Sequence, residues 1–433
     1  MAKQKKKMRL PLKILLWVLC VPLAIAALIA GANTVCTALD MKQVNAIEPV
    51  TIEKQLKPQM DDATGCYTFT TDRELKVMQL SDIHLGAGFL TRSNDKQVIQ
   101  TVETMVRAEK PDLVIVTGDA FFPVPRSGTF NNANELKVFA GLMNRLGVYW
   151  AYTFGNHEYQ GMAYLKESAL AERLEGCSEY CLFQRGSESV SGEGNYAINV
   201  KNSDGVIIRS LILLDSHAYK ADDRWGLGEA YDNIHQDQIE WYKNLVNNFT
   251  ELNKQAIAAT ADLTKRSTYS KNFSIVKSSL FFHIPIEEYK IAWEDYRQNG
   301  YRNTATTEYL YGYMGEEESP YIYCSDEPDN LFEAVMEYGS TDSIFCGHDH
   351  TNNFSLRYMG IRLTYGLSCD CLVYKNIQKL GAQRGCTVLN CKPDGTLEVT
   401  PENYYQEKYA FEGKEEVTMQ VLNEEQEKAQ QHG

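Results

Sequence analysis

The sequence is short of several features that would otherwise suggest a function. No Cys-x-x-Cys pair recurs among its 11 cysteines, so a zinc site built from cysteines is not expected. No internal repeat is obvious. Basic residues are also scarce: the first 13 positions hold six of the 43 Lys and Arg and no acid, so the rest of the chain carries 37 basic against 57 acidic residues. Such an acidic chain is poorly suited to nonspecific nucleic-acid binding, which depends on neutralising phosphates, and no specific nucleic-acid binding is expected.

The composition is that of a folded protein. An apolar content of 44% and an aromatic content of 11% are typical of a globular chain, and 433 residues suffice for one large domain or two ordinary ones. The excess of acid would repel an anionic substrate at long range, so local positive charge has to come from another source, such as bound metal ions. Outside the cytoplasm, Cys177 and Cys181, or the group Cys369, Cys371, Cys386 and Cys391, are candidates for disulfides, with the pairing open.

The N-terminus carries a targeting signal. A basic cytoplasmic head, residues 1–13, precedes residues 14–32, which are apolar and uncharged. At about 1.5 Å per residue this segment makes a helix of roughly 28 Å, enough to cross a hydrocarbon core. Because basic residues stay on the cytoplasmic side, we expect one transmembrane anchor with the rest of the chain outside. The alternative is a signal peptide cleaved near Ala30-Gly31-Ala32, which would leave a secreted protein.

Beyond this segment the patterns predict alternating strands and helices. Residues 33–72 read as a polar connector, residues 73–410 as one α/β domain, and residues 411–433 as a polar tail that forms a loose surface helix or is disordered. Strands are predicted at 75–80, 113–116, 149–154, 206–214, 279–282 and 343–346, and helices at 98–108, 135–146, 235–254 and 330–338. This alternation predicts parallel strands, whose carboxyl ends are where such sheets bind ligands.

Five short segments carry the chemically active residues, and each follows a predicted strand. Five of the eight histidines lie in them. A single segment of this kind is a weak signal, but five in order favour a metal centre. The segments are Asp82-Ile83-His84, Gly118-Asp119, Gly155-Asn156-His157-Glu158, His283 ahead of Ile284-Pro285, and Gly347-His348-Asp349-His350.

The residue types in these segments fit a dinuclear centre. Carboxylate oxygen, imidazole nitrogen and amide oxygen suit borderline divalent ions such as Mn, Fe, Zn or Co. Asp82 and His84 are two residues apart, so on an extended chain both side chains leave the same face, and the same holds for His348 and His350. Asp119 has two oxygens and can bridge two ions. Two ions about 3.5–4 Å apart can hold a hydroxide nucleophile between them and clamp both ends of an in-line displacement at phosphorus.

His157 is the candidate catalytic residue. It follows Asn156, an amide ligand, directly, so its side chain is expected to point elsewhere. It suits a general acid that protonates the leaving oxygen, or a positive contact to the phosphate.

In this order the segments resemble the calcineurin-like metallophosphoesterase superfamily over about residues 74–370, and most closely its purple-acid-phosphatase-like branch. Residues 281–285 with Glu288-Tyr289, 214–217, 235–241 and 346–353 are similar to segments of that branch. The resemblance implies a four-layer α/β/β/α sandwich of two mixed sheets and hydrolysis of phosphate esters. It also implies that one ion binds Asp82, His84, Asp119 and His350, that the other binds Asp119, Asn156, His283 and His348, and that His157 is catalytic.

One position departs from the branch. Purple enzymes carry Gly-Asp-x-x-Tyr, whose tyrosine binds ferric iron, whereas Phe122 stands there in this chain. We therefore expect no purple colour.

Several alternatives remain at this stage. Monoester and diester chemistry use the same ligands, so a phosphodiesterase for a nucleotide or lipid headgroup is the second candidate, and an inactive membrane-tethered binding module the third. Asp215 is read as a cap at a strand end, and His235 as a helix-start residue. Asp349 is expected to support its loop, and the tyrosines between Tyr301 and Tyr323 to pack within an insertion.

Overall fold

The computed structural model describes residues 10–431 except 222–228, 316–321, 375–376, 378–383, 412, 415–416 and 418. Residues 1–9 of the basic head, and Tyr321 of the tyrosine-rich stretch, lie outside the described residues.

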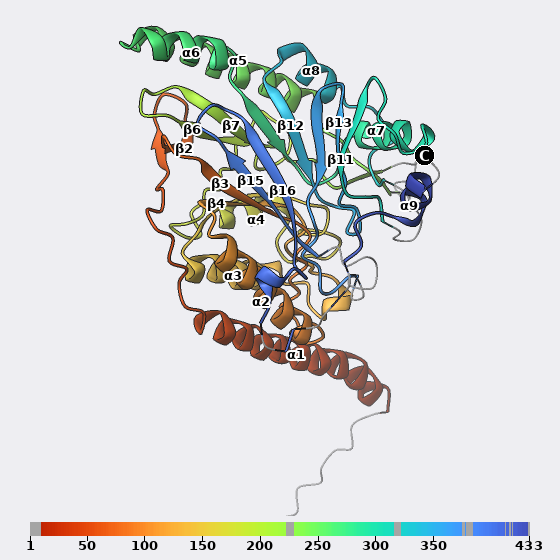
Figure 1. The fold of residues 1–433 in the computed structure, drawn as a ribbon. Coiled ribbons are helices and arrows are strands. Elements are labelled where there is room, and N and C mark those ends of the chain that lie inside the picture. The colour runs from red at the N-terminus through yellow and green to blue at the C-terminus, as the bar shows by residue number, and fades with distance from the viewer. Residues whose placement is uncertain are drawn as a thin grey trace, which may run out of the picture.

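Two mixed sheets form the centre of the domain (Figure 1). In the described part of the chain, the larger sheet has the order β1 (Gln59–Asp61), β2 (Cys66–Thr70), β6 (Tyr196–Lys201), β7 (Ile207–Leu213), β10 (Ser278–Phe281), β12 (Thr341–Cys346), β14 (Ile361–Tyr365), β13 (Ser355–Tyr358) and β11 (Thr307–Tyr311). The smaller has the order β16 (Leu397–Asn403), β15 (Gly385–Cys391), β3 (Leu75–Leu80), β4 (Leu113–Thr117) and β5 (Tyr149–Thr153). A separate ribbon pairs β8 (Tyr219–Ala221) with β9 (Glu229–Tyr231).

Helices cover both outer faces of this pair of sheets (Figure 1). On the side of the smaller sheet lie α1 (Leu10–Asn45), α2 (Arg92–Glu109), α3 (Asn132–Leu146) and α4 (Glu167–Leu174). On the side of the larger sheet lie α5 (Gln236–Ala259), α6 (Leu263–Phe273), α7 (Glu287–Gln298) and α8 (Leu331–Tyr338). Short 3₁₀ turns occupy Pro125–Ser127 and Glu407–Tyr409, and α9 (Glu424–Gln431) lies near the C-terminus.

The larger sheet buries both faces, which explains its nearly continuous apolar strands. Leu211 and Leu213 of β7 belong to the core shared with β3, β4, α2 and α3. The alternate residues Ile212 and Leu214 belong to a second core shared with α5, α7 and α8. Successive side chains of a strand point to opposite faces, so the same strand closes both cores. The four-layer α/β/β/α sandwich expected from the resemblance is confirmed.

The predicted elements are found with shifts of a few residues at their ends. The parallel arrangement is also confirmed, because β4 pairs in parallel with β3 and β5, and β10 with β7 and β12. Residues 33–72, which were predicted to be a polar connector, contain regular secondary structure. Residues 33–45 continue α1, and β1 and β2 add two strands to the larger sheet. Val44, Ile47 and Val50 are part of the first core, so residues 33–72 are not a free spacer.

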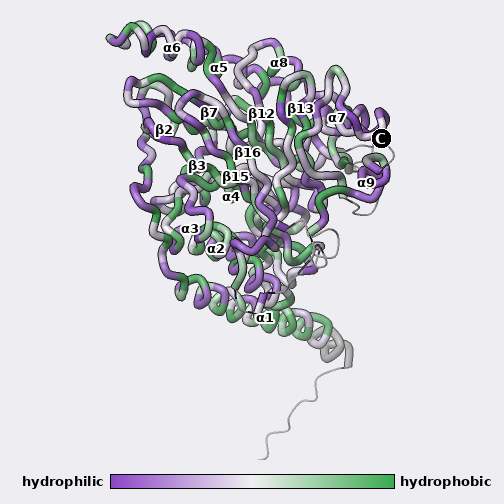
Figure 2. The backbone as a smooth tube through the Cα atoms, in the orientation of Figure 1, coloured by the Kyte–Doolittle hydropathy of each residue, from purple (hydrophilic) through white to green (hydrophobic). Residues whose placement is uncertain are grey.

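The two ends of the chain differ in polarity, as Figure 2 shows. The side chains of residues 17–31 in α1 are apolar and exposed, and this helix is long and apolar enough to cross a membrane. The C-terminal tail contains the polar surface helix α9, which is held to the domain. Gln426 is fully buried and donates a hydrogen bond to the carbonyl oxygen of Gly312 at 3.3 Å.

Candidate metal centre

Eight candidate residues converge where the two sheets meet, each just beyond the carboxyl end of a strand. β3, β4 and β5 of the smaller sheet and β10 and β12 of the larger sheet supply them. All are buried except His157, whose side chain is 19% exposed. In chain order they are Asp82 and His84 after β3, Asp119 after β4, Asn156 and His157 after β5, His283 after β10, and His348 and His350 after β12.

The backbone that presents these side chains is strained. Asp82, His84, Asp119 and His348 have φ angles of 51°, 50°, 51° and 80°, in the left-handed region that few residues other than glycine adopt. The expectation that the first two residues share a face because the chain is extended is therefore wrong. The turns in the backbone, rather than strand geometry, aim these side chains into the site.

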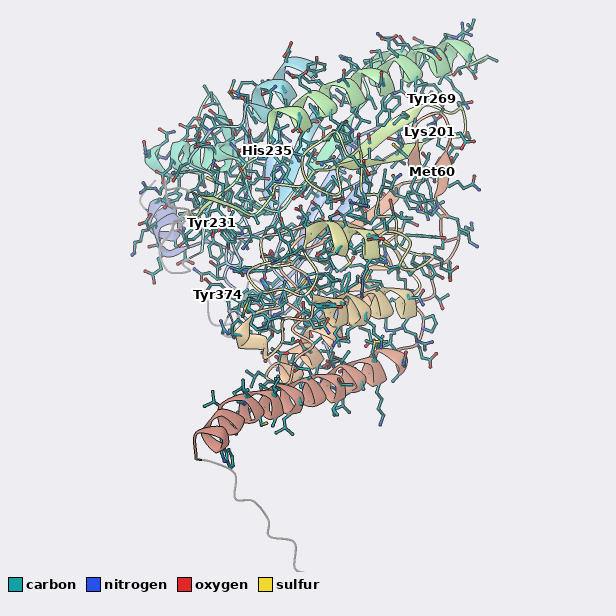
Figure 3. The ribbon with its side chains drawn as sticks, turned by 180° about the vertical axis from the view of Figure 1, so that it is seen from behind. Met60, Lys201, Tyr231, His235, Tyr269 and Tyr374 are labelled. Carbon is teal, nitrogen blue, oxygen red and sulfur yellow. The ribbon has the colours of Figure 1, made fainter. Side chains whose placement is uncertain are left out.

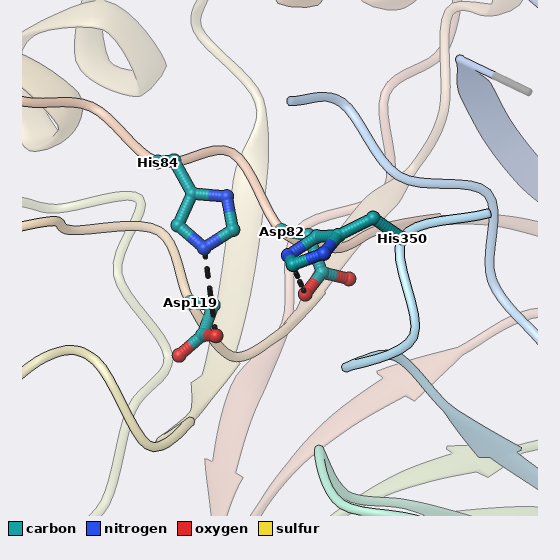
Figure 4. A group of neighbouring side chains, drawn as sticks. All are labelled: Asp82, His84, Asp119 and His350. Carbon is teal, nitrogen blue, oxygen red and sulfur yellow. Dashed lines mark ion pairs between the residues drawn. The ribbon is translucent and has the colours of Figure 1, made fainter. Parts of the chain in front are cut away.

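Four of the residues form one group around Asp119 (Figure 4). His84 Nε2 lies 3.5 Å from Asp119 Oδ2, and His350 Nε2 lies 3.6 Å from Asp82 Oδ1. Ligand atoms of Asp82, His84, Asp119 and His350 all lie within 4.8 Å of one another. Such a set of two carboxylates and two imidazoles can hold a divalent ion.

A second group uses the same aspartate. His283 Nε2 lies 3.1 Å from Asp119 Oδ2 and 3.1 Å from Asn156 Oδ1. His348 Nδ1 lies 3.3 Å from His283 Nε2, and Asp119, His283 and His348 also have ligand atoms within 4.8 Å of one another. Asp119 thus belongs to both groups, as a bridging ligand would.

The hydrogen bonds around the two ligand groups leave imidazole nitrogens and an oxygen of Asp119 available to bind metal ions. His283 donates from Nδ1 to the carbonyl oxygen of Thr117 at 2.8 Å, so in the neutral imidazole Nε2 is the nitrogen that is free to bind a metal ion. Asp119 Oδ1 accepts from the backbone N–H of His157 at 2.8 Å. Within the described residues, Nε2 of His348 is buried with no hydrogen-bond partner, and the buried Asp119 Oδ2 has only imidazole nitrogens near it, the nearest being those of His283 and His84 at 3.1 and 3.5 Å. Buried polar atoms of this kind are costly unless they are paired, so the donor set fits two cations.

The electrostatics of the site favour added positive charge. Burial alone would raise the pKa of Asp119, but the imidazoles of His283 and His157 outweigh it and hold the pKa well below its usual value. Burial likewise opposes protonation of His84, yet Asp119 and Asp370 raise its pKa to about 10. The pKa of His283 rises to about 9 for the same reason, against its burial. The raised pKa values of His84 and His283 come from buried carboxylates, and the same negative charge would favour a metal cation.

Two glycines allow the ligand loops to pack closely, and one glutamate links two of these loops by hydrogen bonds. A side chain at Gly118 would place its Cβ 2.6 Å from His283 Nδ1, and one at Gly155 would meet Asp119 Oδ1 at 2.3 Å. Glu158 accepts from the backbone N–H of Ala120 at 2.7 Å and of Gly155 at 2.9 Å. This carboxylate therefore ties the loop after β4 to the loop after β5.

Comparisons with known proteins show which proteins this chain is similar to. The model of the calcineurin-like phosphoesterase family matches residues 75–352. The chain belongs to this family. It is 24% identical over 352 residues to a protein of Arabidopsis thaliana named probable inactive purple acid phosphatase 14, which covers 76% of this chain and 78% of that one. It is 27% identical over 304 residues to phosphatase DCR2 of Saccharomyces cerevisiae, over 66% of this chain and 46% of that one. A crystal structure of a dimetal phosphatase from Danio rerio aligns over 73% of this chain and 93% of that one, with 12% identity and a TM-score of 0.41.

His157 is the least buried of the eight candidate residues. Its Nε2 is 3.8 Å from Asp119 Oδ2, and its Nδ1 donates to Gln160 Oε1 at 2.7 Å. Burial lowers the pKa of His157, and the charge of Asp119 opposes this effect. The Phe122 ring stands edge-on to the rings of His84 and His157, with centroid distances of 5.2 and 5.0 Å. Phe122 therefore closes one side of the site with a hydrocarbon surface.

Four residues that contact the candidate metal centre were not assigned from the sequence. Asp370 pairs with His84, with Oδ1 3.4 Å from Nδ1. The hydroxyl of Tyr219 accepts a 2.7 Å hydrogen bond from Asn156 Nδ2. The rings of Tyr231 and Tyr374 contact His348 and His350, with centroid distances of 4.7 and 4.8 Å. In Figure 3 both tyrosines lie on one side of the domain, Tyr374 at a height between Tyr231 and α1.

The residues that the sequence analysis expected to have structural roles make structural contacts. Asp215 accepts from the backbone N–H groups of His217 and Glu193 at 2.8 and 2.9 Å, as a strand-end cap does. Asp349 accepts from the Tyr365 hydroxyl at 2.6 Å and so supports its loop. His235 is the N-cap residue of α5, and its ring stacks on that of His217 with a centroid distance of 4.0 Å.

Proposed function

We propose that this protein hydrolyses phosphate esters with two divalent metal ions, Mn, Fe or Zn. The observation that carries the proposal is the position of Asp119 Oδ2, which lies 3.5 Å from His84 and 3.1 Å from His283 and so joins the two ligand groups. One ion would take Asp82, His84, Asp119 and His350, and the other Asp119, Asn156, His283 and His348. When bound, such ions offset the charge of a phosphate and lower the pKa of water to near neutral.

The chain's own residues supply the remaining functions. Asp370 and Thr117 orient the imidazoles of His84 and His283 through their Nδ1 atoms. His157 is fixed through Nδ1 by Gln160, which leaves Nε2 as the atom that would pass a proton to the leaving oxygen once the imidazole is protonated. It is the member of the site with the largest exposure, so an ester group that enters from solvent meets it directly.

A catalytically silent binding module is the alternative from outside the enzymes, because the Arabidopsis relative is named as probably inactive. Loss of activity in such a module normally removes ligands. Here every ligand position is filled by a residue able to bind, which supports the enzyme.

We further propose that α1 anchors the protein in a membrane, with the domain outside the cytoplasm. Support comes from the uncharged length of residues 14–32 and from the six basic residues before it. Cleavage as a signal peptide remains the alternative, and the mass of the mature chain distinguishes the two.

The deciding experiment measures hydrolysis of p-nitrophenyl phosphate and bis-p-nitrophenyl phosphate by the full chain in detergent, with Mn, Zn or a chelator. Turnover that requires metal supports the enzyme, and the preferred ester separates phosphatase from phosphodiesterase. A folded chain that binds two ions but turns over neither ester would favour the binding module.

A further inference from the structure

The domain forms hydrogen bonds with α1 directly after the apolar segment of this helix. The side chains of residues 17–31 are exposed, whereas Asn33 and Thr37 are buried against the domain. Asn33 donates from Nδ2 to the carbonyl oxygen of Gly128 at 2.9 Å, and its Oδ1 accepts from the backbone N–H of Phe89 at 2.9 Å. Thr37 donates to the carbonyl oxygen of Ala87 at 3.2 Å. No flexible linker separates the membrane segment from the domain, because α1 is continuous through this point.

The loops that hold α1 are the loops of the metal centre. Ala87 follows His84 by three residues, and Gly128 lies in the loop that begins with Phe122, beside His84 and His157. Three residues span at most about 11 Å, and the five helical residues from Thr37 back to the apolar segment rise about 8 Å. The site therefore lies within roughly 20 Å of the point where α1 would enter a bilayer.

Exposed apolar side chains cover the same loops. Leu90 is 56% exposed and Tyr164 is 66% exposed. The backbone N–H of Leu90 bonds to the Ser127 carbonyl oxygen, and that of Tyr164 to the Phe130 carbonyl oxygen, at 3.4 and 2.7 Å. Both residues are thus held beside one short stretch, residues 127–130. We call Phe89, Leu90 and Tyr164 the apolar rim.

A lipid bilayer is the partner that suits the apolar rim. Exposed apolar groups of this kind mark a membrane or protein contact, and here Phe89 is hydrogen-bonded to Asn33, two residues after the exposed apolar segment of α1. Figure 1 shows α1 passing along the edge of the domain at α2 and α3, with α6 at the opposite end. A site at this distance from the membrane segment would lie near the bilayer surface, where phosphorylated lipid headgroups lie.

We propose that the metal centre works at the membrane surface and that its substrate class is the phosphomonoester headgroup of a lipid in the bilayer that holds α1. This inference rests on the proposed phosphoesterase function and on the membrane anchor. In the reaction, the oxygen of water bonds to phosphorus and the bond from phosphorus to the lipid oxygen breaks. That oxygen leaves with a proton, which gives inorganic phosphate and, from phosphatidate, diacylglycerol.

The first test reconstitutes the full chain in phosphatidylcholine vesicles that contain phosphatidate, and compares phosphate release from this lipid with turnover of soluble p-nitrophenyl phosphate. The double variant Leu90→Ser/Tyr164→Ser should lower the ratio of lipid to soluble turnover about five- to tenfold, since membrane contact scales with buried apolar area. Leu263→Ser on α6, where Leu263 is 72% exposed, is the matched control and should keep the wild-type ratio.

The possible outcomes distinguish a failure of the lipid-substrate proposal from a failure of the proposed phosphoesterase function. Turnover of p-nitrophenyl phosphate or of a soluble phosphopeptide without release from phosphatidate would overturn the lipid substrate and leave the phosphoesterase standing. An unchanged ratio in the double variant would overturn the role of the apolar rim.

A second test does not depend on turnover. Tryptophan is placed at the rim by Leu90→Trp or at the far end by Leu263→Trp, and lipids with brominated acyl chains are added as quenchers. Both proteins keep the native tryptophans, so the comparison isolates the new one. Stronger quenching in Leu90→Trp is expected, and equal quenching in the two would overturn the membrane-facing orientation.

Discussion

His283 Nε2 lies 3.1 Å from Asp119 Oδ2, so the shared aspartate joins the two sheets at the metal centre. His283 follows β10 of the larger sheet, and Asp119 follows β4 of the smaller one. Neither sheet alone holds a complete ligand set, because the first group also needs His350 from the larger sheet. Metal binding should therefore respond to any change that separates the sheets.

Replacing this shared carboxylate tests the dinuclear arrangement. In Asp119→Asn the side chain keeps its size but loses the charge, and we expect metal content to fall from two ions to one or fewer, with turnover lower by about a thousandfold. Metal content is measured by mass spectrometry after dialysis, and folding by circular dichroism. Asp394→Asn, in an exposed turn, is the control. A variant that retains two ions would show that Asp119 does not bridge.

The role of His157 is tested through the leaving group. His157→Asn should retain both ions, but turnover should fall by about 10²–10⁴, and more for phenyl phosphate than for p-nitrophenyl phosphate, because the poorer leaving group needs the proton more. Gln160→Ala, which removes the partner of Nδ1, should show the same trend with a smaller loss. An equal loss with both esters would instead assign His157 to phosphate binding.

The visible absorption of the iron-loaded protein tests the consequence of having Phe122 where purple enzymes have an iron-binding tyrosine. With iron bound, the wild-type protein should show no visible tyrosinate band, since the ring beside His84 carries no hydroxyl. The absorption spectrum of the iron-loaded protein measures this. A band would indicate that another tyrosine reaches the iron, and Tyr219 and Tyr231 would be the residues to change, because they contact Asn156 and His348.

The sequence was informative where a short apolar run ends in a polar motif. β3, β4, β5, β10 and β12 could be placed for this reason, and with them the eight residues that the structure brings together. Asp370 carries no such signal. It follows β14 by several residues, and only the course of the chain after that strand brings it to His84. Tyr231 likewise reaches His348 through a small ribbon whose strands are too short to show a period.

The extension of α1 was missed for a different reason. Its buried face after the apolar segment is marked by Asn33, Thr37, Asp40 and Val44, which recur at helical spacing. The first three are polar, so a search for apolar periodicity does not find the helix. They are buried because each has a polar partner, for example Arg92, whose Nη1 lies 2.8 Å from Asp40 Oδ1.

Truncation tests how much the exposed apolar part of α1 and the buried part that follows it each contribute to the stability of the domain. A chain that starts at Asn33 should keep the stability of the domain, because residues 17–31 contact little of it. A chain that starts at Thr51 loses Val44, Ile47 and Val50 from the core, and burial of three such side chains is worth about 5 kcal/mol. Urea unfolding of both chains measures the difference. Equal midpoints would show that residues 33–50 are a dispensable connector after all.

Glu167 offers a test of stability against pH that is remote from the metal ligands. Its carboxyl group hydrogen-bonds that of Asp215, and burial together with the charge of Asp215 raises the pKa of Glu167 to about 9. The folded protein therefore keeps a proton that the unfolded chain releases near its usual pKa. Since the folded state binds more protons in this range, the free energy of unfolding should decrease as pH rises from about 4.5 to about 9.

Glu167→Gln removes this dependence, because an amide keeps a hydrogen-bond donor for Asp215 and has no proton to lose. We expect the variant to be more stable than wild type at about pH 8, by about 2 kcal/mol, and nearly equal to it at about pH 5. Urea unfolding at several pH values measures both. Glu172→Gln, on the exposed side of the same helix, should follow the wild-type curve. If Glu167→Gln shows the wild-type slope, the two carboxyl groups do not share a proton in the folded state.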